Sequence, residues 1–275
     1  MKAITLATFV LVSLINAASA QDAKRALINV EGDVYRWQNN AHFGLVVFTD
    51  SGVVVADPIN AAASSWLEAE IAKKTDLPVT HLIYSHSHAD HASGGEVFED
   101  TAEIVAHQNA PDKIVGVTVD HRVADEDSLT VSNKTFEFTY LGAGHGTDLM
   151  AVVVRPENVA FVVDAMAPRR LPFRDMPNAN IDDWTDQVRK VGSLDFDILS
   201  PGHGNVGTHE NVAEVVIYME TLRAEVLAGL QAGKSVEELQ EELTFNEYSS
   251  WLGFDWRAAN IAGAARSLNE SGALN

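Results

Sequence analysis

The chain has 275 residues, a formal net charge of -20 and no cysteine. This length suits one large domain or two small ones, and 46% hydrophobic with 21% charged residues indicates a globular protein. Nucleic acids and anionic membranes are bound through basic patches, so a chain this acidic argues against both as partners. Without cysteine there can be no disulfide or thiolate ligand, and any metal ion must be held by His, Asp or Glu.

The first twenty residues predict a secretory signal peptide. Lys2 gives a positive start, Ile4 to Ile15 is mostly apolar, and Ala18-Ser19-Ala20 has the small-x-small form of a cleavage site. A membrane anchor would need a longer apolar run. We therefore expect cleavage before Gln21, one domain over residues 21–275 with no membrane anchor, and export to the periplasm.

The first half of the mature chain is predicted to be rich in strands. Apolar and β-branched runs alternate with turn residues, and Thr49-Asp50-Ser51-Gly52 suits a hairpin turn. One segment has the spacing of an amphipathic helix. The expected elements, in order, are strands at Asp33–Trp37 and on both arms of Phe43–Asp57, a helix at Ala61–Thr75, strands at Val79–Tyr84 and Glu103–Ala106, and a short helix at Asn109–Val115.

The second half is predicted to alternate strands and helices. The expected elements are strands at Thr135–Leu141, Leu149–Val154 and Val159–Val163, a helix at Asp182–Val191, a strand at Asp197–Leu199, and helices at Glu210–Ala232, Val236–Leu243 and Arg257–Leu268. Strands and helices in this order indicate an α+β protein with two sheets, helices on the outer faces, and a site where strand ends meet.

Ser85-His86-Ser87-His88-Ala89-Asp90-His91 follows the strand Val79–Tyr84 and precedes the turn Gly94-Gly95. Imidazole nitrogens and carboxylate oxygens are standard zinc ligands, and the spacing His-x-His directs both rings to one side if the segment is extended. A polar loop with solvated histidines is the alternative. Three histidines and one aspartate within six positions favour a metal site.

Three further ligand-type residues follow predicted strands: His145, Asp164 and His203. Glycines flank both histidines, which lets the backbone turn sharply beside a bound ion. A lone histidine in a glycine-rich loop is more often structural than a ligand. Taken together with residues 86–91, in this order, the three form a strong pattern.

This pattern resembles the metallo-β-lactamase-fold superfamily. The resemblance rests on His86-x-His88-x-Asp90-His91, His145 in Gly-His-Gly, Asp164 at a strand end and His203 in Pro-Gly-His-Gly, and it covers about residues 30 to 230. It implies a four-layer αββα sandwich, with metals at one edge of the paired sheets.

The resemblance also implies the ligands. His86, His88 and His145 would hold a first metal, Asp90, His91 and His203 a second, and Asp164 would bridge them. Two Zn²⁺ ions are the default, although iron or manganese accept the same ligands. Such a pair generates a bridging hydroxide near neutral pH, which attacks a carbonyl carbon, and Asp90 would orient it and shuttle the proton.

Several activities share these ligands. The pattern with export favours a zinc hydrolase that opens a β-lactam or a lactone, with a small molecule as its substrate. The loop at His145 departs from the Thr-x-Gly-His-Thr pattern of the hydroxyacylglutathione hydrolases, which argues against a glutathione thioester. A persulfide dioxygenase with one iron on His86, His145 and Asp164 stays an alternative, as does a protein that binds metal without turnover.

The roles of several other residues stay open. Arg169 and Arg170 follow Asp164 closely and could grip a substrate carboxylate, or simply lie on the surface. Asp57 could orient a site histidine or only cap its loop. His42 could line the pocket or lie at the surface, and the surface is favoured. His121 is expected to be structural, and the tryptophans are expected to pack in cores.

Overall fold

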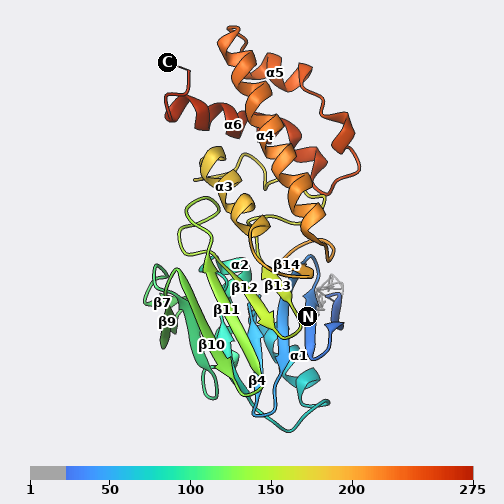
Figure 1. The fold of residues 1–275 in the computed structure, drawn as a ribbon, viewed down its shortest axis with the longest axis vertical. Coiled ribbons are helices and arrows are strands. Elements are labelled where there is room, and N and C mark those ends of the chain that lie inside the picture. The colour runs from blue at the N-terminus through green and yellow to red at the C-terminus, as the bar shows by residue number, and fades with distance from the viewer. Residues whose placement is uncertain (1–22, 275) are drawn as a thin grey trace, which may run out of the picture.

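The computed structural model describes residues 23–274, so the predicted signal peptide lies outside the described part. Two sheets stack face to face beneath a group of helices (Figure 1). The first sheet has the order β1-β2-β3-β4-β5-β6-β9 and the second β10-β11-β12-β13-β14. Strands β4, β5, β6 and β9 run parallel, as do β13 and β14, so their carboxyl ends meet at common sheet edges.

The elements have the following bounds. The first sheet contains β1 (Arg25–Glu31), β2 (Val34–Asn39), β3 (His42–Phe48), β4 (Val53–Ala56), β5 (Val79–Ile83), β6 (Glu103–His107) and β9 (His121–Val123), and a small ribbon pairs β7 (Lys113–Ile114) with β8 (Val117–Thr118). The second sheet contains β10 (Glu126–Val131), β11 (Lys134–Tyr140), β12 (Met150–Arg155), β13 (Val159–Val162) and β14 (Ile198–Pro201). The helices are α1 (Ala61–Ile71), α2 (Ala89–Ala92), α3 (Ile181–Gly192), α4 (His209–Gln231), α5 (Val236–Glu242) and α6 (Arg257–Glu270).

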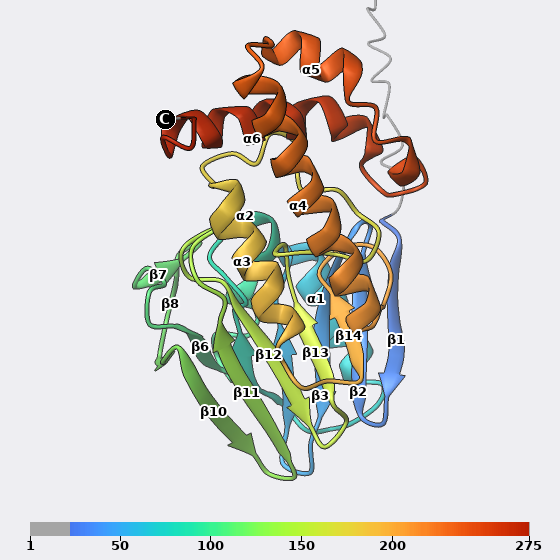
Figure 2. The ribbon, with the colours of Figure 1, turned by 45° about the horizontal axis from the view of Figure 1, so that its top comes forward.

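Three buried apolar clusters hold four layers together. Between the sheets, Val54 packs in one cluster with Phe136 and Phe161. On the outer face of the first sheet, Leu67 of α1 shares a cluster with Leu82. Helices α3 and α4 cover the outer face of β12, β13 and β14 (Figure 2). The predicted α+β class and the four-layer αββα sandwich are confirmed.

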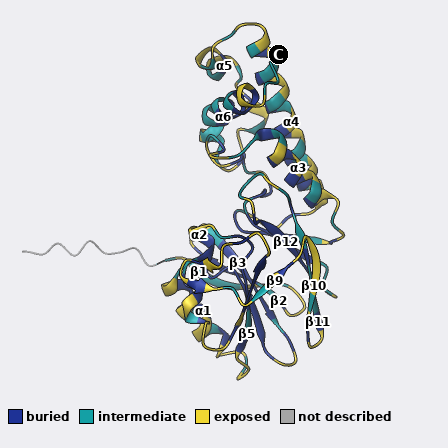
Figure 3. Ribbon diagram, turned by 90° about the vertical axis from the view of Figure 1, so that its left-hand side faces the viewer, coloured by how far each residue is buried: buried dark blue, intermediate teal, exposed yellow. Residues whose placement is uncertain are grey.

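Helices α5 and α6 stand beyond one end of the sandwich, next to the far end of α4 (Figure 3). They are tied to the loop after β13 through Asn260 of α6. The buried Tyr218 hydroxyl donates to Asn260 Oδ1 at 2.7 Å, and Asn260 Nδ2 donates to the carbonyl of Pro172 at 3.0 Å. None of the helices in residues 23–274 is long and apolar enough to cross a membrane.

Most predicted elements are present within a few residues of their expected bounds. The helix expected at Asn109–Val115 is wrong, because this stretch forms a turn and strand β7. Pro111 cannot donate within a helix, and Val115 and Gly116 have φ angles of 47° and 92° that close the turn to β8. Strands β1 and β10 were not predicted; both are sheet edges, so polar residues interrupt their apolar pattern.

Candidate metal centre

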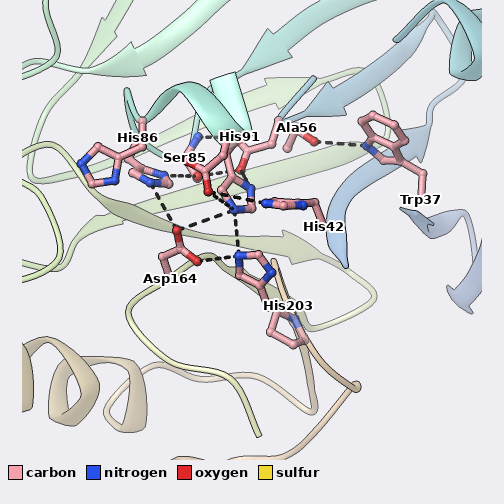
Figure 4. Close-up of polar contacts among 12 residues, drawn as sticks. Trp37, His42, Ala56, Ser85, His86, His91, Asp164 and His203 are labelled. Atoms are coloured by element: carbon pink, nitrogen blue, oxygen red, sulfur yellow. Dashed lines mark hydrogen bonds and ion pairs between the residues drawn. The ribbon is translucent and has the colours of Figure 1, made fainter. Parts of the chain in front are cut away.

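All seven residues of the predicted ligand set meet at one edge of the sandwich. Figure 4 labels four of them: His86, His91, Asp164 and His203. The four residues of positions 86–91 follow β5, with the last two on the short helix α2. The other three lie in the loops after β11, β13 and β14. Asp164 has a φ of 54°, so the chain turns sharply there and directs the carboxylate at the edge. Their ligand atoms fall into two groups.

The first group consists of His86, His88, His145 and Asp164. The His88 Nδ1 and His145 Nε2 atoms lie 3.0 Å apart, and His145 Nε2 lies 3.3 Å from Asp164 Oδ2. The His86 Nε2 atom is 3.7 Å from the same oxygen. Three imidazoles and one carboxylate therefore face a common point.

The second group consists of His42, Asp90, His91 and His203. The Nε2 atoms of His91 and His203 are 3.2 Å apart, and His91 Nε2 is 3.9 Å from Asp90 Oδ2. Asp164 also reaches this group, with Oδ1 at 3.0 Å from His203 Nε2 and Oδ2 at 3.6 Å from His91 Nε2. One carboxylate thus lies between the two groups.

The charge states suit metal ligands. Burial lowers the pKa of His86 well below its ordinary value, and burial also lowers the pKa of His88 and His203, so these rings are neutral near pH 7. Burial alone would raise the pKa of Asp164, but hydrogen bonds from His145 and His203 hold it well below its usual range. A neutral imidazole and an ionised carboxylate are the states in which these four side chains bind a cation. Burial alone would lower the pKa of His91, but Asp57 and the neighbouring carboxylates raise it, so a cation there has to displace a proton.

Polar contacts from Asp57 and Ser85 orient two of the ligand histidines. Asp57, fully buried, accepts from the Ser85 backbone N–H at 2.8 Å and from its hydroxyl at 2.7 Å, and lies 3.5 Å from His91 Nδ1. The Ser85 Oγ atom is in turn 3.0 Å from His86 Nδ1. Carboxylates that hold the far nitrogen of a ligand imidazole are typical of metal sites. The geometry favours the orienting role for Asp57 over a loop cap.

The remaining ligands are held from elsewhere in the fold. His203 Nδ1 lies 2.8 Å from the carbonyl of Ala41, in the turn between β2 and β3. The His145 backbone N–H donates to Gln187 Oε1 at 2.7 Å, and Gln187 Nε2 donates to the Gly142 carbonyl at 2.7 Å. Helix α3 therefore fixes the loop that carries His145.

Two observations test whether the residues fit divalent ions. Donors bound to one tetrahedral zinc lie about 3.3–3.5 Å apart, since the bonds are about 2.0–2.2 Å long. The contacts within each group, 3.0–3.7 Å in the first and 3.2–3.9 Å in the second, span this separation. The buried His86 Nε2 atom has no hydrogen-bond partner within residues 23–274. The residues fit a divalent metal at each group.

The profile of the metallo-beta-lactamase superfamily matches residues 42–203, more than half of the chain. The chain belongs to the metallo-beta-lactamase superfamily. It is 23% identical to 2,4-dinitroanisole O-demethylase subunit alpha of Nocardioides sp. (strain JS1661), over 83% of this chain and 78% of that protein. It is 25% identical to metallo-beta-lactamase type 2 of Bacteroides fragilis, over 67% of this chain and 76% of that protein.

The same fold appears among solved structures. A metallo-beta-lactamase from Pontibacter korlensis superposes with a TM-score of 0.64 at 17% identity, covering 72% of this chain and 99% of that one. The superfamily profile ends at His203, so α4, α5 and α6 lie beyond it. The part shared with the superfamily therefore carries all seven predicted ligands.

A cavity of about 620 Å³ opens over the two groups of ligand residues. Its floor includes Asp90, His145 and Asp164. Its walls are mainly apolar and come from the loop after β13 and from helices α3 and α4: Met166, Leu171, Phe173, Trp184, Val215 and Met219. Such a site takes a small molecule with an apolar body.

The two arginines predicted to bind substrate point to different places in the structure. Arg169 is exposed and forms an ion pair with Glu214 of α4 at 3.2 Å, in agreement with the alternative that it lies on the surface. Arg170 lines the cavity, with its guanidinium 5.3 Å from the Trp256 ring centre. No carboxylate within residues 23–274 forms an ion pair with Arg170. Only Arg170 is placed to meet a substrate.

Two residues of the site have roles that the sequence did not favour. His42 lines the cavity, the less favoured of its two alternatives, and its Nε2 atom is 3.5 Å from Asp90 Oδ2. Trp184 is buried as predicted, but its ring also lies 5.1 Å from the His145 ring and lines the cavity. The one sequence feature that could have pointed to His42 is its position at the start of a strand, directly after a tight turn. That position indicates a role in the site only once the structure shows that the turn lies beside α2.

Proposed function

We propose that this protein is a two-metal hydrolase that opens a cyclic amide or ester, a lactam or a lactone, with zinc as its default metal. The position of Asp164 supports this best. Its two oxygens lie 3.0–3.7 Å from four imidazole nitrogens, two in each group. A carboxylate shared in this way is suited to hold two cations a few ångströms apart.

When bound, two divalent ions would acidify a water molecule and polarise the scissile carbonyl. The protein supplies the proton transfer. Asp90 lines the cavity with a half-exposed side chain, and the contact with His42 is the largest cause that keeps its pKa below the usual range. In the reaction a water oxygen bonds to the carbonyl carbon, the ring C–N or C–O bond breaks, and Asp90 passes the proton to the departing atom.

Arg170 supplies an anchor for an anionic substrate. Burial lowers the pKa of Arg170, while the nearby carboxylates of Asp164 and Asp90 raise it, so the group stays a cation at neutral pH. A guanidinium without a carboxylate partner, at the wall of an apolar cavity, matches a substrate with one carboxylate. Many small lactams carry such a group beside the ring.

A second substrate class is an aryl methyl ether. The O-demethylase relative matches a larger share of this chain than the Bacteroides lactamase does, 83% against 67%. Phe173 and Trp184 give the cavity two aromatic walls on which an aryl ring can stack. The oxygen of the same acidified water would then bond to the ring carbon that carries the methoxy group. The bond from that carbon to the ether oxygen would break, and the methoxy group would take up a proton and leave as methanol.

The test begins with the metal content of the purified mature chain. It continues with hydrolysis of a chromogenic cephalosporin, an acyl-homoserine lactone, 2,4-dinitroanisole and a glutathione thioester. Two zinc ions per chain, with turnover of one ring substrate that Asp90→Ala abolishes, supports the proposal. One iron per chain, with oxygen uptake on a persulfide and no hydrolysis, overturns it in favour of a dioxygenase.

We extend the proposal to export into the periplasm. The charged start, the apolar run and Ala18-Ser19-Ala20 support it. Expression of the full chain, fractionation of the cells and N-terminal sequencing test it. We expect a periplasmic protein that begins at Gln21; an uncut protein in the cytoplasm would refute export.

A further inference from the structure

His42 has no role in the ligand set that the superfamily resemblance implies. It begins β3, directly after the turn at Asn40, which has a φ of 57°. Its side chain is 30% exposed, and its ring points into the cluster beside His91 and His203 (Figure 4). The ring centres lie 5.2 Å from His91 and 4.7 Å from His203.

We propose that His42 is a further protein ligand of the second metal, besides Asp90, His91, His203 and the bridging Asp164. The Nε2 atom of His42 and the ligand atoms of Asp90, His91 and His203 all lie within 4.8 Å of one another. With His42, this group has three imidazoles and one carboxylate, which is the composition of the first group. The inference rests on the two-metal centre of the proposed function and is independent of its substrate.

The distance between His42 and Asp90 is compatible with this role. Their atoms Nε2 and Oδ2 are 3.5 Å apart. A direct N–H···O bond to a carboxylate is about 2.7–2.9 Å long. Two ligands on one tetrahedral zinc are about 3.3–3.5 Å apart. The observed distance fits two ligands on one ion.

Within residues 23–274, the ion pair of the His42 ring is with Asp90, a member of the same group. The supporting residues Asp57 and Gln187, by contrast, each make two hydrogen bonds of 2.7–2.8 Å. The adjacent Ala41 carbonyl already holds His203. The turn between β2 and β3 would therefore support the second metal in two ways. The Ala41 carbonyl orients His203, and the His42 ring would bind the ion directly.

With the bridging Asp164, His42 would give the second ion five protein donors, against four at the first. His42 would therefore make the second ion the more firmly held of the two. Loss of a residue that only supports a ligand costs about 10–100-fold in metal affinity. Loss of a direct ligand is expected to cost at least tenfold at the second ion and to leave the first within about twofold.

The test uses the mature chain loaded with Co²⁺. In the paramagnetic protein, each coordinated histidine gives one strongly shifted, exchangeable ring N–H signal in proton NMR. We expect six such signals, from His42 and the five histidines of the predicted set, and five in His42→Ala. Chelator competition should show one ion at least tenfold weaker in His42→Ala and in His42→Asn. The control is His121→Ala, since His121 lies on β9 outside both groups.

Each outcome decides the inference. Six signals in the unaltered protein, with one lost in His42→Ala, support it without any need for activity. Five signals in both the unaltered protein and His42→Ala overturn it, even if the protein hydrolyses a substrate. Metal affinities that are unchanged at both sites in His42→Ala overturn it as well. A chain that binds no ion overturns both this inference and the proposed function. Failure of every substrate, with six signals present, refutes the proposed function alone.

Discussion

Asp57 offers the sharpest test of how the fold supports the metal centre. Its carboxylate holds Ser85, which holds His86 in the first group, and it faces His91 in the second. In Asp57→Asn, one oxygen remains to accept from the Ser85 backbone. The new amide N–H group would then face the His91 Nδ1–H, a second donor, so that contact is lost, and the Ser85 hydroxyl would have to accept where it now donates.

The magnitude follows from these contacts. Loss of a supporting partner costs about 10–100-fold in metal affinity, equivalent to about 1.4–2.8 kcal/mol. Because Asp57 supports one histidine in each group, we expect zinc affinity at both sites to fall by this factor. Hydrogen bonds to charged groups contribute about 1.5–3 kcal/mol, so the metal-free protein should lose an amount of this order in free energy of unfolding.

Competition with a fluorescent chelator measures both affinities, and urea unfolding with excess chelator measures the stability of the metal-free form. Asp50→Asn is the matched control, because Asp50 is an exposed residue of the turn between β3 and β4. Zinc affinities within twofold of the unaltered protein, together with a loss of stability in the metal-free form, would refute the orienting role. Asp57 would then support the fold alone.

Three further outcomes are expected. Arg170→Gln should raise KM for a carboxylate-bearing substrate about tenfold or more while kcat changes little, and Arg169→Gln should change neither, as steady-state kinetics would show. Trp184→Phe removes the 2.7 Å hydrogen bond from its indole to the Ala165 carbonyl and should cost about 1–3 kcal/mol in urea unfolding. Leu67→Ala, a fully buried site in α1, should cost about 2–5 kcal/mol without weakening zinc binding; weaker binding would show that α1 couples to the centre.

The predicted ligands could be found from sequence because their pattern is local. Four of them lie within six residues after one strand, and the others follow strand ends beside glycine. Strands with a common direction bring such ends to one sheet edge, so the chain order alone places them together. The layers were predictable for the same reason, since apolar runs and amphipathic helices have short periods.

His42 and Arg170 could not be assigned from sequence because their roles depend on contacts across the fold. His42 meets Asp90 only after β3 and α2 are placed side by side, and no spacing rule connects the two residues. Arg169 and Arg170 are adjacent and chemically identical. The turn at Arg169, with a φ of 50°, sends one side chain to α4 and the other into the cavity.

The division of labour along the chain has a consequence for substrate choice. The predicted ligands end at His203, with the superfamily profile, while Val215 and Met219 of α4 line the cavity from beyond it. Asn260 of α6 holds the backbone at Pro172, beside Phe173 in the cavity wall. The candidate metal centre and most of the cavity wall are therefore built from the shared part, and helix α4 adds Val215 and Met219 to that wall. Because the body of the proposed substrate would contact the wall while its reacting bond would contact the centre, relatives with the same ligands can act on different molecules.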